Sequence, residues 1–177
     1  VQLWLGNSCH LVSYPIQNNQ AVNFVFAFSD SAFTSHSIDT IFCDHPVLSM
    51  LGVYSQNWHL TPIRQFDLLS NWRRGGVTLI GDAAHPMPPH LAQGAGQSFM
   101  DVASIENGLR KGLSLSESIY DMITIRMPEA HSVSRKSQIS GNIFRMNGPI
   151  SDLRNQLISI AGQKIISDFL QDLWLTV

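Results

Sequence analysis

Residues 81–97 read Gly-Asp-Ala-Ala-His-Pro-Met-Pro-Pro-His-Leu-Ala-Gln-Gly-Ala-Gly-Gln. The apolar run Val77–Ile80 before them favours a short β-strand, and the residues after them have helical spacing. This order places the Asp82 carboxylate after a strand, where it can accept hydrogen bonds from hydroxyl groups. It also places backbone N–H groups at the start of a helix, where they stabilise negative charge. A ligand with a polyol chain and an electron-rich ring edge would suit both features.

Asp82 alone would not predict a binding site, because an Asp after a strand is often only a turn former or a cap. Its neighbours favour a binding loop. Ala83 and Ala84 leave space beside the carboxylate, and three nearby prolines stiffen the loop. Gly94 and Gly96 allow the backbone to approach a ligand closely. A simple connection between two elements needs neither a stiff loop, nor small side chains, nor a helix start. Their combination therefore favours a binding loop.

Composition limits the classes of protein to which the chain can belong. It has 177 residues, 44% of them hydrophobic and 14% charged, with a net charge of −2. These values favour one well-buried domain, or the larger part of one, and exclude a nucleic-acid binder. The two cysteines form no disulfide framework, and no apolar run reaches the roughly 18–20 residues of a membrane span. We therefore expect a cytoplasmic protein without a membrane partner.

The N-terminal third is rich in strand signals. Residues 2–5, 10–16 and 21–28 read as three short strands joined by polar turns, which predicts an antiparallel meander. Residues two apart in a strand share a face, so His10 and Tyr14 would lie on one side of the sheet. They could form a titratable pair in a site, or they could simply be polar surface.

The remaining elements are predicted from helical spacing and breakers. After residues 97–110, Lys111 and Gly112 are typical of a helix end, and Ser114 or Ser116 with Glu117 can start the next helix. A proline at 128 predicts a bend, and Gly148–Pro149 predicts a helix end. The expected helices are 37–43, 46–54, 97–110, 114–127, 128–144, 151–161 and 163–173, with an extended stretch at 58–66 and a turn at 71–76.

The motif Gly-Asp-Ala-Ala-His-Pro at 81–86, with Pro89 and Gln-Gly-Ala-Gly-Gln at 93–97, resembles the second flavin-binding motif of FAD-dependent aromatic hydroxylases. These are single-component flavoprotein monooxygenases, and this chain is similar to salicylate and 3-hydroxybenzoate hydroxylases. Asp101 falls where that family usually has an acidic residue. The strand from His10 to Pro15 and the residues 58–76 also resemble the family's substrate-domain sheet and its lead-in to the motif.

The resemblance implies a role for each matched residue. Asp82 would bind the ribityl hydroxyls of FAD, and the backbone N–H groups of Gly94, Ala95 and Gly96 would face the pyrimidine edge of the flavin. Residues 86–89, with Pro88 toward the substrate and Pro89 toward the cofactor, would line the ring. The family's catalytic and substrate-binding positions correspond to His10 and Tyr14, of which the imidazole would take or share a phenolic proton.

The resemblance also sets the expected architecture, an α+β or α/β fold. Residues 1–76 would be substrate-domain sheet and helices, 77–112 the ring-side flavin motif, and 113–177 the C-terminal helices. The family's N-terminal Rossmann βαβ unit, with its Gly-x-Gly-x-x-Gly turn, has no counterpart in the sequence. We therefore expect the C-terminal portion of such an enzyme, inactive alone and without tight affinity for FAD.

The expected activity is hydroxylation of a phenolic small molecule with FAD, O2 and either NADH or NADPH. Two alternatives remain, a non-catalytic binding or interaction module and a related flavin monooxygenase with a non-aromatic substrate. The sequence also leaves a homodimer open. His85 and His90 have neither helical nor strand spacing, so no metal site is expected.

Overall fold

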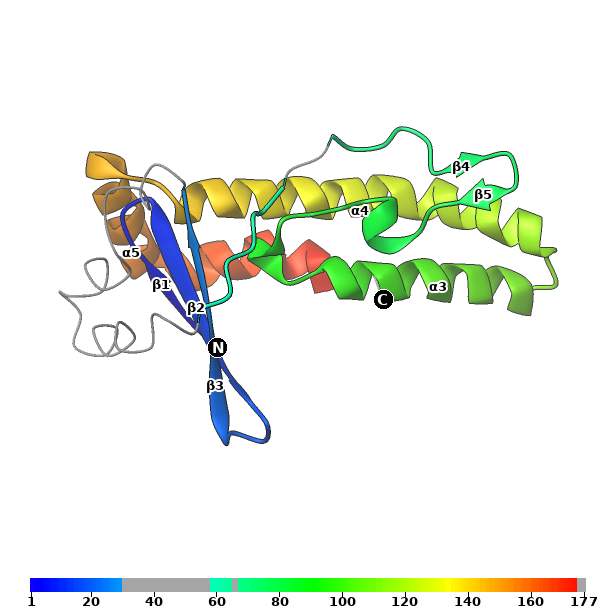
Figure 1. Cartoon of the computed structure of the whole chain (residues 1–177). Helices are drawn as coiled ribbons and strands as arrows, with labels where there is room; N and C mark the ends of the chain where they lie inside the picture. The colour runs from blue at the N-terminus through cyan, green and yellow to red at the C-terminus, as the bar shows by residue number, and fades with distance from the viewer. Residues whose placement is uncertain (30–57, 65–66, 175–177) are drawn as a thin grey trace. The chain divides into compact units, whose positions relative to one another are not determined.

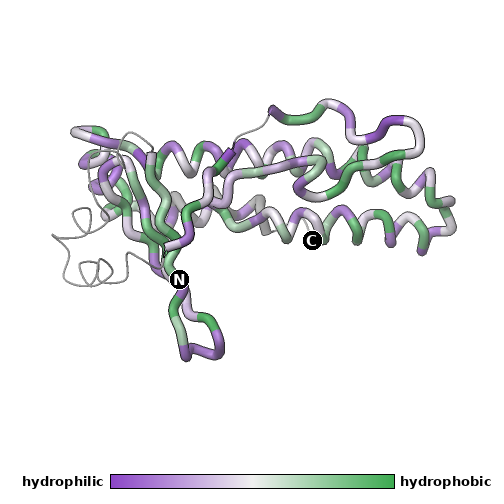
Figure 2. Tube along the Cα trace, in the orientation of Figure 1, coloured by the Kyte–Doolittle hydropathy of each residue, from purple (hydrophilic) through white to green (hydrophobic). Residues whose placement is uncertain are grey.

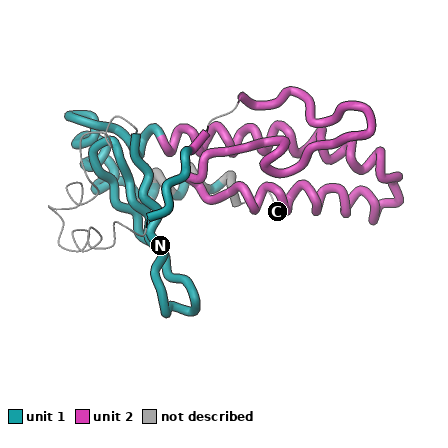
Figure 3. The backbone as a smooth tube through the Cα atoms, viewed as in Figure 1, with its two compact units in different colours: residues 1–62, 142–177 teal, residues 63–141 magenta. Residues whose placement is uncertain are grey.

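The computed structural model of the chain describes residues 1–29, 58–64 and 67–174 (Figure 1). It divides into two compact units, residues 1–62 with 142–177, and residues 63–141 (Figure 3). The helices expected at 37–43 and 46–54 lie outside the described residues. Residues 58–64, expected to be extended, contain no regular secondary structure. The proposed three-part domain assignment stays a prediction.

The first unit contains a three-stranded antiparallel sheet of β1 (Gln2–Leu5), β2 (Cys9–Ile16) and β3 (Ala21–Phe28), in the order β1-β2-β3. The predicted meander is therefore confirmed, with β2 beginning one residue earlier than expected. Leu11 lies opposite Trp4 on one side and Phe26 on the other. Leu11 is 1% exposed, and Trp4, Phe24, Phe26 and Trp58 pack against it as the apolar core of this unit.

The helix α5 (Gly148–Trp174) corrects two predictions. The expected stop before Gly148–Pro149 is confirmed, because the preceding helix ends at Phe144, but the next helix begins at Gly148 rather than at residue 151. The missing N–H of a proline is not needed in the first turn of a helix. The two short helices expected after residue 151 form one continuous helix. Arg154 is buried and donates to the carbonyl oxygens of Ile143 (3.1 Å), Phe144 (2.9 Å) and Gly6 (3.3 Å). One guanidinium thereby ties α5 to the preceding helix end and to the β1–β2 turn.

The second unit begins with a two-stranded ribbon of β4 (Arg73–Arg74) and β5 (Val77–Thr78). The strand expected over residues 77–80 is thus shorter, and the expected turn at 71–76 contributes its partner strand. Two 3-10 turns follow, η2 (Gly81–Ala83) and η3 (Pro89–Leu91). The helix α3 (Gly94–Arg110) then packs near η2, as Figure 1 shows.

The helix α4 (Leu115–Phe144) passes through Pro128 without ending, so the predicted bend between two helices is wrong. A proline in a helix interior costs about 3 kcal/mol, but packing on both sides of Pro128 offsets this cost. Met122 and Ala130 are completely buried and form the core of this unit with Trp72 and Ala84. Ser114 caps α4 together with Glu117, as the sequence predicts, through reciprocal bonds of 2.8 and 3.3 Å.

Hydrophobic and hydrophilic residues alternate along α3 and α4, as the colours in Figure 2 show. This is typical of helices that bury one face and expose the other. Among the described residues, no helix combines the length and the apolar character needed to cross a membrane.

Candidate functional site

The glycine-rich segment forms the first turn of α3 rather than a turn before it. The helix begins at Gly94, three residues earlier than predicted, because Gln97 N already donates to Gln93 O (2.9 Å). Gln93 precedes the helix but makes no side-chain cap. Ala95 and Gly96 are exposed. The first backbone N–H groups of α3 therefore open toward solvent at the positive end of the helix.

Asp82 lies in η2 beside this helix start. A Cβ added to Gly94 would lie 3.5 Å from Asp82 Oδ1, so the carboxylate approaches the first residue of α3. The Asp82 side chain is exposed. The structure thus brings together Asp82, Gly94, Ala95 and Gly96, the residues that the sequence assigns to the cofactor.

The proline-rich loop is fixed to α4. The Ser137 hydroxyl donates to the carbonyl oxygen of Pro88 (2.6 Å), and Pro88 is buried. Pro89 is exposed and begins η3. A Cβ at Gly141 would overlap the ring of His90, so α4 and this loop approach as closely as a glycine permits. The two prolines expected to line the ring are therefore held at a defined position within the unit.

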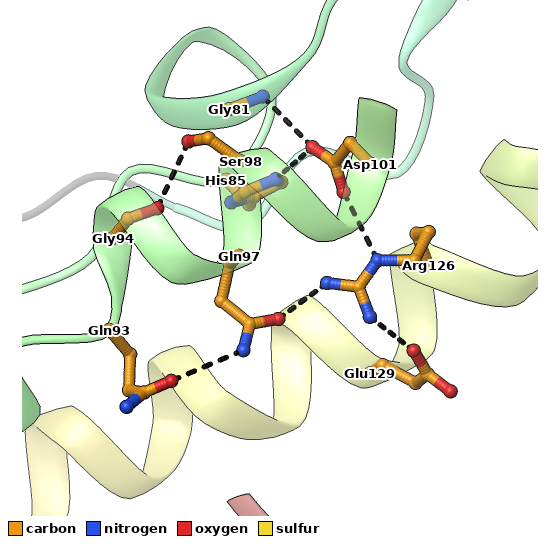
Figure 4. A network of polar contacts seen from close by, with 9 residues as sticks. All are labelled: Gly81, His85, Gln93, Gly94, Gln97, Ser98, Asp101, Arg126 and Glu129. Carbon is orange, nitrogen blue, oxygen red and sulfur yellow. Dashed lines mark hydrogen bonds and ion pairs between the residues drawn. The ribbon is translucent and has the colours of Figure 1, made fainter. Parts of the chain in front are cut away.

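Asp101 anchors the turn that carries Asp82 (Figure 4). Its side chain is completely buried, and Oδ2 accepts hydrogen bonds from Gly81 N (3.0 Å) and His85 Nε2 (2.7 Å). Arg126 Nε donates to the other oxygen at 3.2 Å. Burial acts to raise the pKa of Asp101, but the hydrogen bonds from His85, Gly81 and Arg126 outweigh it and hold the pKa below its ordinary value. Asp101 is therefore an ionised, fully bonded carboxylate.

Arg126 extends this network into α4. Its guanidinium also donates to Gln97 Oε1 and to Glu129 Oε2, so one buried cation joins both carboxylates and an amide (Figure 4). Its side chain is 4% exposed. A buried charge of this kind is tolerated only when nearly all its donors are bonded. The network thus locks α3, α4 and the η2 turn together.

Gly81 completes the anchor through its backbone conformation. Its φ of +58° lies in the region that favours glycine, and a Cβ there would lie 2.7 Å from Ser98 Oγ. Only a glycine allows η2 to approach α3 this closely. Asp82 follows Gly81 directly in the sequence. The direction of its side chain is therefore set by a turn that is hydrogen-bonded to Asp101 and packed against Ser98.

The two residues expected on the substrate side belong to the first unit. His10 is buried, and its ring lies edge-on to that of Phe144 with centroids 5.1 Å apart. Tyr14 is exposed, and its hydroxyl accepts a hydrogen bond from Asn23 Nδ2 (2.7 Å). His10 is therefore not simple polar surface, whereas Tyr14 lies at the open end of the same strand face.

Sequence reasoning missed His85, Gln97 and Arg126 as parts of the site. His85 stood inside the quoted motif but was considered only as a metal ligand. Two signals could have found the network. Gln97 and Asp101 are polar residues four apart on α3, and Arg126 shares a face of α4 with the apolar Met122 and Ala130.

The residues present fit the ring side of a flavin. The Asp82 carboxylate supplies acceptors for a polyol, and the uncapped start of α3 supplies donors for an electron-rich edge. Both are exposed, whereas the network that holds them is buried.

Parts of the chain are similar to known proteins. A family model described as an FAD binding domain matches residues 30–116. The chain is 27% identical to 3-hydroxybenzoate 6-hydroxylase 1 of Aquipseudomonas alcaligenes, over 95% of the chain and 44% of that protein. It is 29% identical to 3-amino-4-hydroxybenzoate 2-monooxygenase PtmB3 of Streptomyces platensis, over 91% of the chain and 44% of that protein.

A solved structure has a similar fold. The chain matches a salicylate hydroxylase substrate complex with a TM-score of 0.57 and 24% identity, over 99% of the chain and 49% of that structure. The chain spans less than half the length of these curated relatives. The expected mixed α+β fold is confirmed. The motif, the matched FAD binding domain and these relatives show that the chain is similar to FAD-dependent aromatic hydroxylases and monooxygenases.

Proposed function

We propose that this chain is part of a monooxygenase that hydroxylates a phenolic small molecule with O2 and NADH or NADPH. The observation that carries the proposal is the Asp82 carboxylate beside the uncapped start of α3, with the whole turn fixed by buried Asp101. When bound, FAD would supply the oxygen chemistry. The names of the relatives, which are hydroxybenzoate hydroxylases and monooxygenases, support an aromatic substrate.

The roles of the residues follow from their chemistry. Asp82 would accept hydrogen bonds from the ribityl hydroxyls, and the N–H groups of Gly94, Ala95 and Gly96 would stabilise negative charge on the pyrimidine edge. Pro88 and Pro89 would form a rigid wall beside the ring. On the substrate strand, His10 would take or share the phenolic proton, and Tyr14 would hydrogen-bond the substrate.

A flavin titration tests the cofactor half of the proposal. FAD and riboflavin should bind the purified chain with similar affinities, weaker than about 1 μM, because the proposed contacts involve only the ring and the ribityl chain. Fluorescence quenching of each flavin measures both values. Sub-micromolar binding of FAD would contradict the expectation of a weak ring-side site. Absence of any flavin binding would favour the non-catalytic interaction module.

The substrate half is tested by NMR of the ring signals. Adding a hydroxybenzoate to the flavin-loaded chain should shift the signals of His10 and Tyr14, since both are proposed to contact the phenol. The signals of His59, an exposed histidine of the same unit, should not move. If flavin binds and no hydroxybenzoate shifts His10, the related monooxygenase with a non-aromatic substrate becomes the better account.

A further inference from the structure

Four side chains of the second unit each carry a buried polar atom that has no hydrogen-bond partner among the described residues. They are Trp72 Nε1, His85 Nδ1, His131 Nε2 and Ser134 Oγ. Trp72 is 1% exposed, and His85 and Ser134 are completely buried. A buried polar group without a hydrogen-bond partner destabilises the folded state. Four such groups in one core require a physical explanation.

The rings of three of these side chains lie close to one another, and the fourth side chain is on the same helix as one of them. The Trp72 ring is 5.1 Å from the His85 ring and 6.1 Å from the His131 ring, measured between centroids. His131 and Ser134 are three residues apart on α4, so they share a helix face. Ser134 also lies between Ala130, which packs with Trp72, and Ser137, which bonds the Pro88 carbonyl just after His85.

The other contacts of the two imidazoles fix their hydrogen-bonding roles. His85 Nε2 bonds the ionised Asp101 carboxylate, so Nε2 carries the proton and Nδ1 is an acceptor in the neutral ring. His131 bonds the backbone of Leu69, and since its Nε2 has no partner, the bonded atom is Nδ1. Its Nε2 is then also an acceptor. Trp72 Nε1 can only donate, and the Ser134 hydroxyl can do either.

This set of two acceptors, one donor and one hydroxyl complements one water molecule. We propose that a buried water binds between Trp72, His85, His131 and Ser134. It donates to His85 Nδ1 and His131 Nε2, and it accepts from Trp72 Nε1 and Ser134 Oγ. Buried waters typically make about three such bonds, so a four-partner site is well within their range.

A metal ion suits this place less well than water. Two imidazole nitrogens could serve as ligands, but the Trp72 N–H would direct a hydrogen toward the cation. The described part of the chain also contains no group of three or more His, Cys, Asp or Glu side chains that could hold a metal. Burial holds the pKa of His131 below its ordinary value, and the Arg135 guanidinium acts in the same direction. A neutral His131 is an acceptor for water.

The proposed water has a consequence for the flavin motif that does not depend on the substrate. His85 would be held from both sides, by Asp101 at Nε2 and by the water at Nδ1. Since Asp101 also bonds Gly81 N, the water would act as a positioning element for the turn that carries Asp82.

A high-resolution crystal structure of the chain is the first test. A water within about 3.2 Å of at least three of the four atoms would support the proposal. No ordered water there, or one that contacts fewer than three of the atoms, would overturn it.

A matched pair of variants tests the site in solution. Ser134→Val places methyl groups where the water is proposed, whereas Ser132→Val changes an exposed residue of the same helix. Water relaxation dispersion should show one long-lived buried water fewer in Ser134→Val and no loss in Ser132→Val. An equal number in wild type and a folded Ser134→Val variant would contradict the proposal.

The imidazole tautomers give a third readout that needs no variant. Nitrogen NMR of the wild-type chain should show His85 protonated at Nε2 and His131 protonated at Nδ1, with the other nitrogen of each in a hydrogen-bonded acceptor state. A proton on His85 Nδ1 or on His131 Nε2 near neutral pH would overturn the assignment of donors and acceptors.

Discussion

The turn that carries Asp82 and the strand that carries His10 belong to different units and are held by different contacts. The Asp82 turn is fixed by buried charges, with Asp101 bonded to Gly81, His85 and Arg126. The His10 strand is fixed by a backbone ladder and by apolar packing around Leu11. Charged networks are sensitive to the loss of one partner, whereas a ladder distributes its stability over many bonds. The two regions should therefore respond very differently to single substitutions.

Asp101→Ala should give the largest effect, because it removes the buried carboxylate that Gly81, His85 and Arg126 share and leaves Arg126 only the partly exposed Glu129 as a counter-charge. The expected loss is about 3–5 kcal/mol in the free energy of unfolding, measured by urea denaturation. The control is Glu106→Ala on the same helix, which breaks only an exposed ion pair with Arg110. That change should cost less than about 1 kcal/mol. Equal losses in the two variants would show that the buried network does not hold the second unit.

Gly81→Ala should be the next most damaging change. The added Cβ meets Ser98 Oγ at 2.7 Å and also requires a positive φ, for a combined cost of about 2–3 kcal/mol. Gly75→Ala is the matched control, since Gly75 has a φ of +60° but open space around it. Its cost should be close to 1 kcal/mol in the same denaturation experiment. A similar cost at both positions would mean that the contact between η2 and α3 is looser than described.

Arg154→Met tests whether the first unit has a charged anchor of its own. It removes bonds to the Ile143, Phe144 and Gly6 carbonyls, with an expected loss of about 1–2 kcal/mol. Lys164→Met, at an exposed position of the same helix, should change the stability by less than about 0.5 kcal/mol. A loss as large as that of Asp101→Ala would remove the contrast between the two units.

The smallest expected effect is a pH dependence. Burial, followed by the charge of Arg135, lowers the pKa of His131 in the folded state, so below about pH 6.5 the unfolded chain binds more protons. Stability from this group is complete above that pH and declines as the pH falls. In His131→Gln the decline in unfolding free energy between pH 7 and pH 5.5 should be shallower. A steeper decline in the variant would mean that folding raises the pKa of His131, which is the opposite of the expected direction.

The sequence predicts best where local pattern and packing agree. The three strands at 2–28 follow from alternating apolar residues between polar turns, and the start of α4 follows from Ser114 and Glu117. The helix break at Pro128 was mispredicted, and the start of α5 was placed three residues too late, because the local rule for proline and glycine takes no account of tertiary packing. Met122 and Ala130 hold α4 together on both sides of Pro128, and Pro149 can begin a helix as readily as it can follow one.

In the candidate site, too, the features that follow from local sequence could be predicted, and those that depend on tertiary packing could not. Asp82, Gly94, Ala95 and Gly96 could be assigned to one place because they lie within one short stretch of sequence. Asp101 could be placed on the helix, but its bonds to Gly81 and to Arg126, separated from it by 20 and 25 residues, depend on how the segments pack. The roles of His10 and Tyr14 stay predictions.

The central claim is that Asp82, beside the start of α3, holds the flavin, and it is tested most directly by the affinity of one variant. Asp82→Ala should weaken FAD binding by about 10- to 100-fold, the value of losing a charged hydrogen-bond acceptor. Asp121→Ala, at an exposed carboxylate of α4 in the same unit, should leave the affinity unchanged. If Asp82→Ala binds FAD as tightly as the wild-type chain, the flavin does not bind at this site and the account is contradicted.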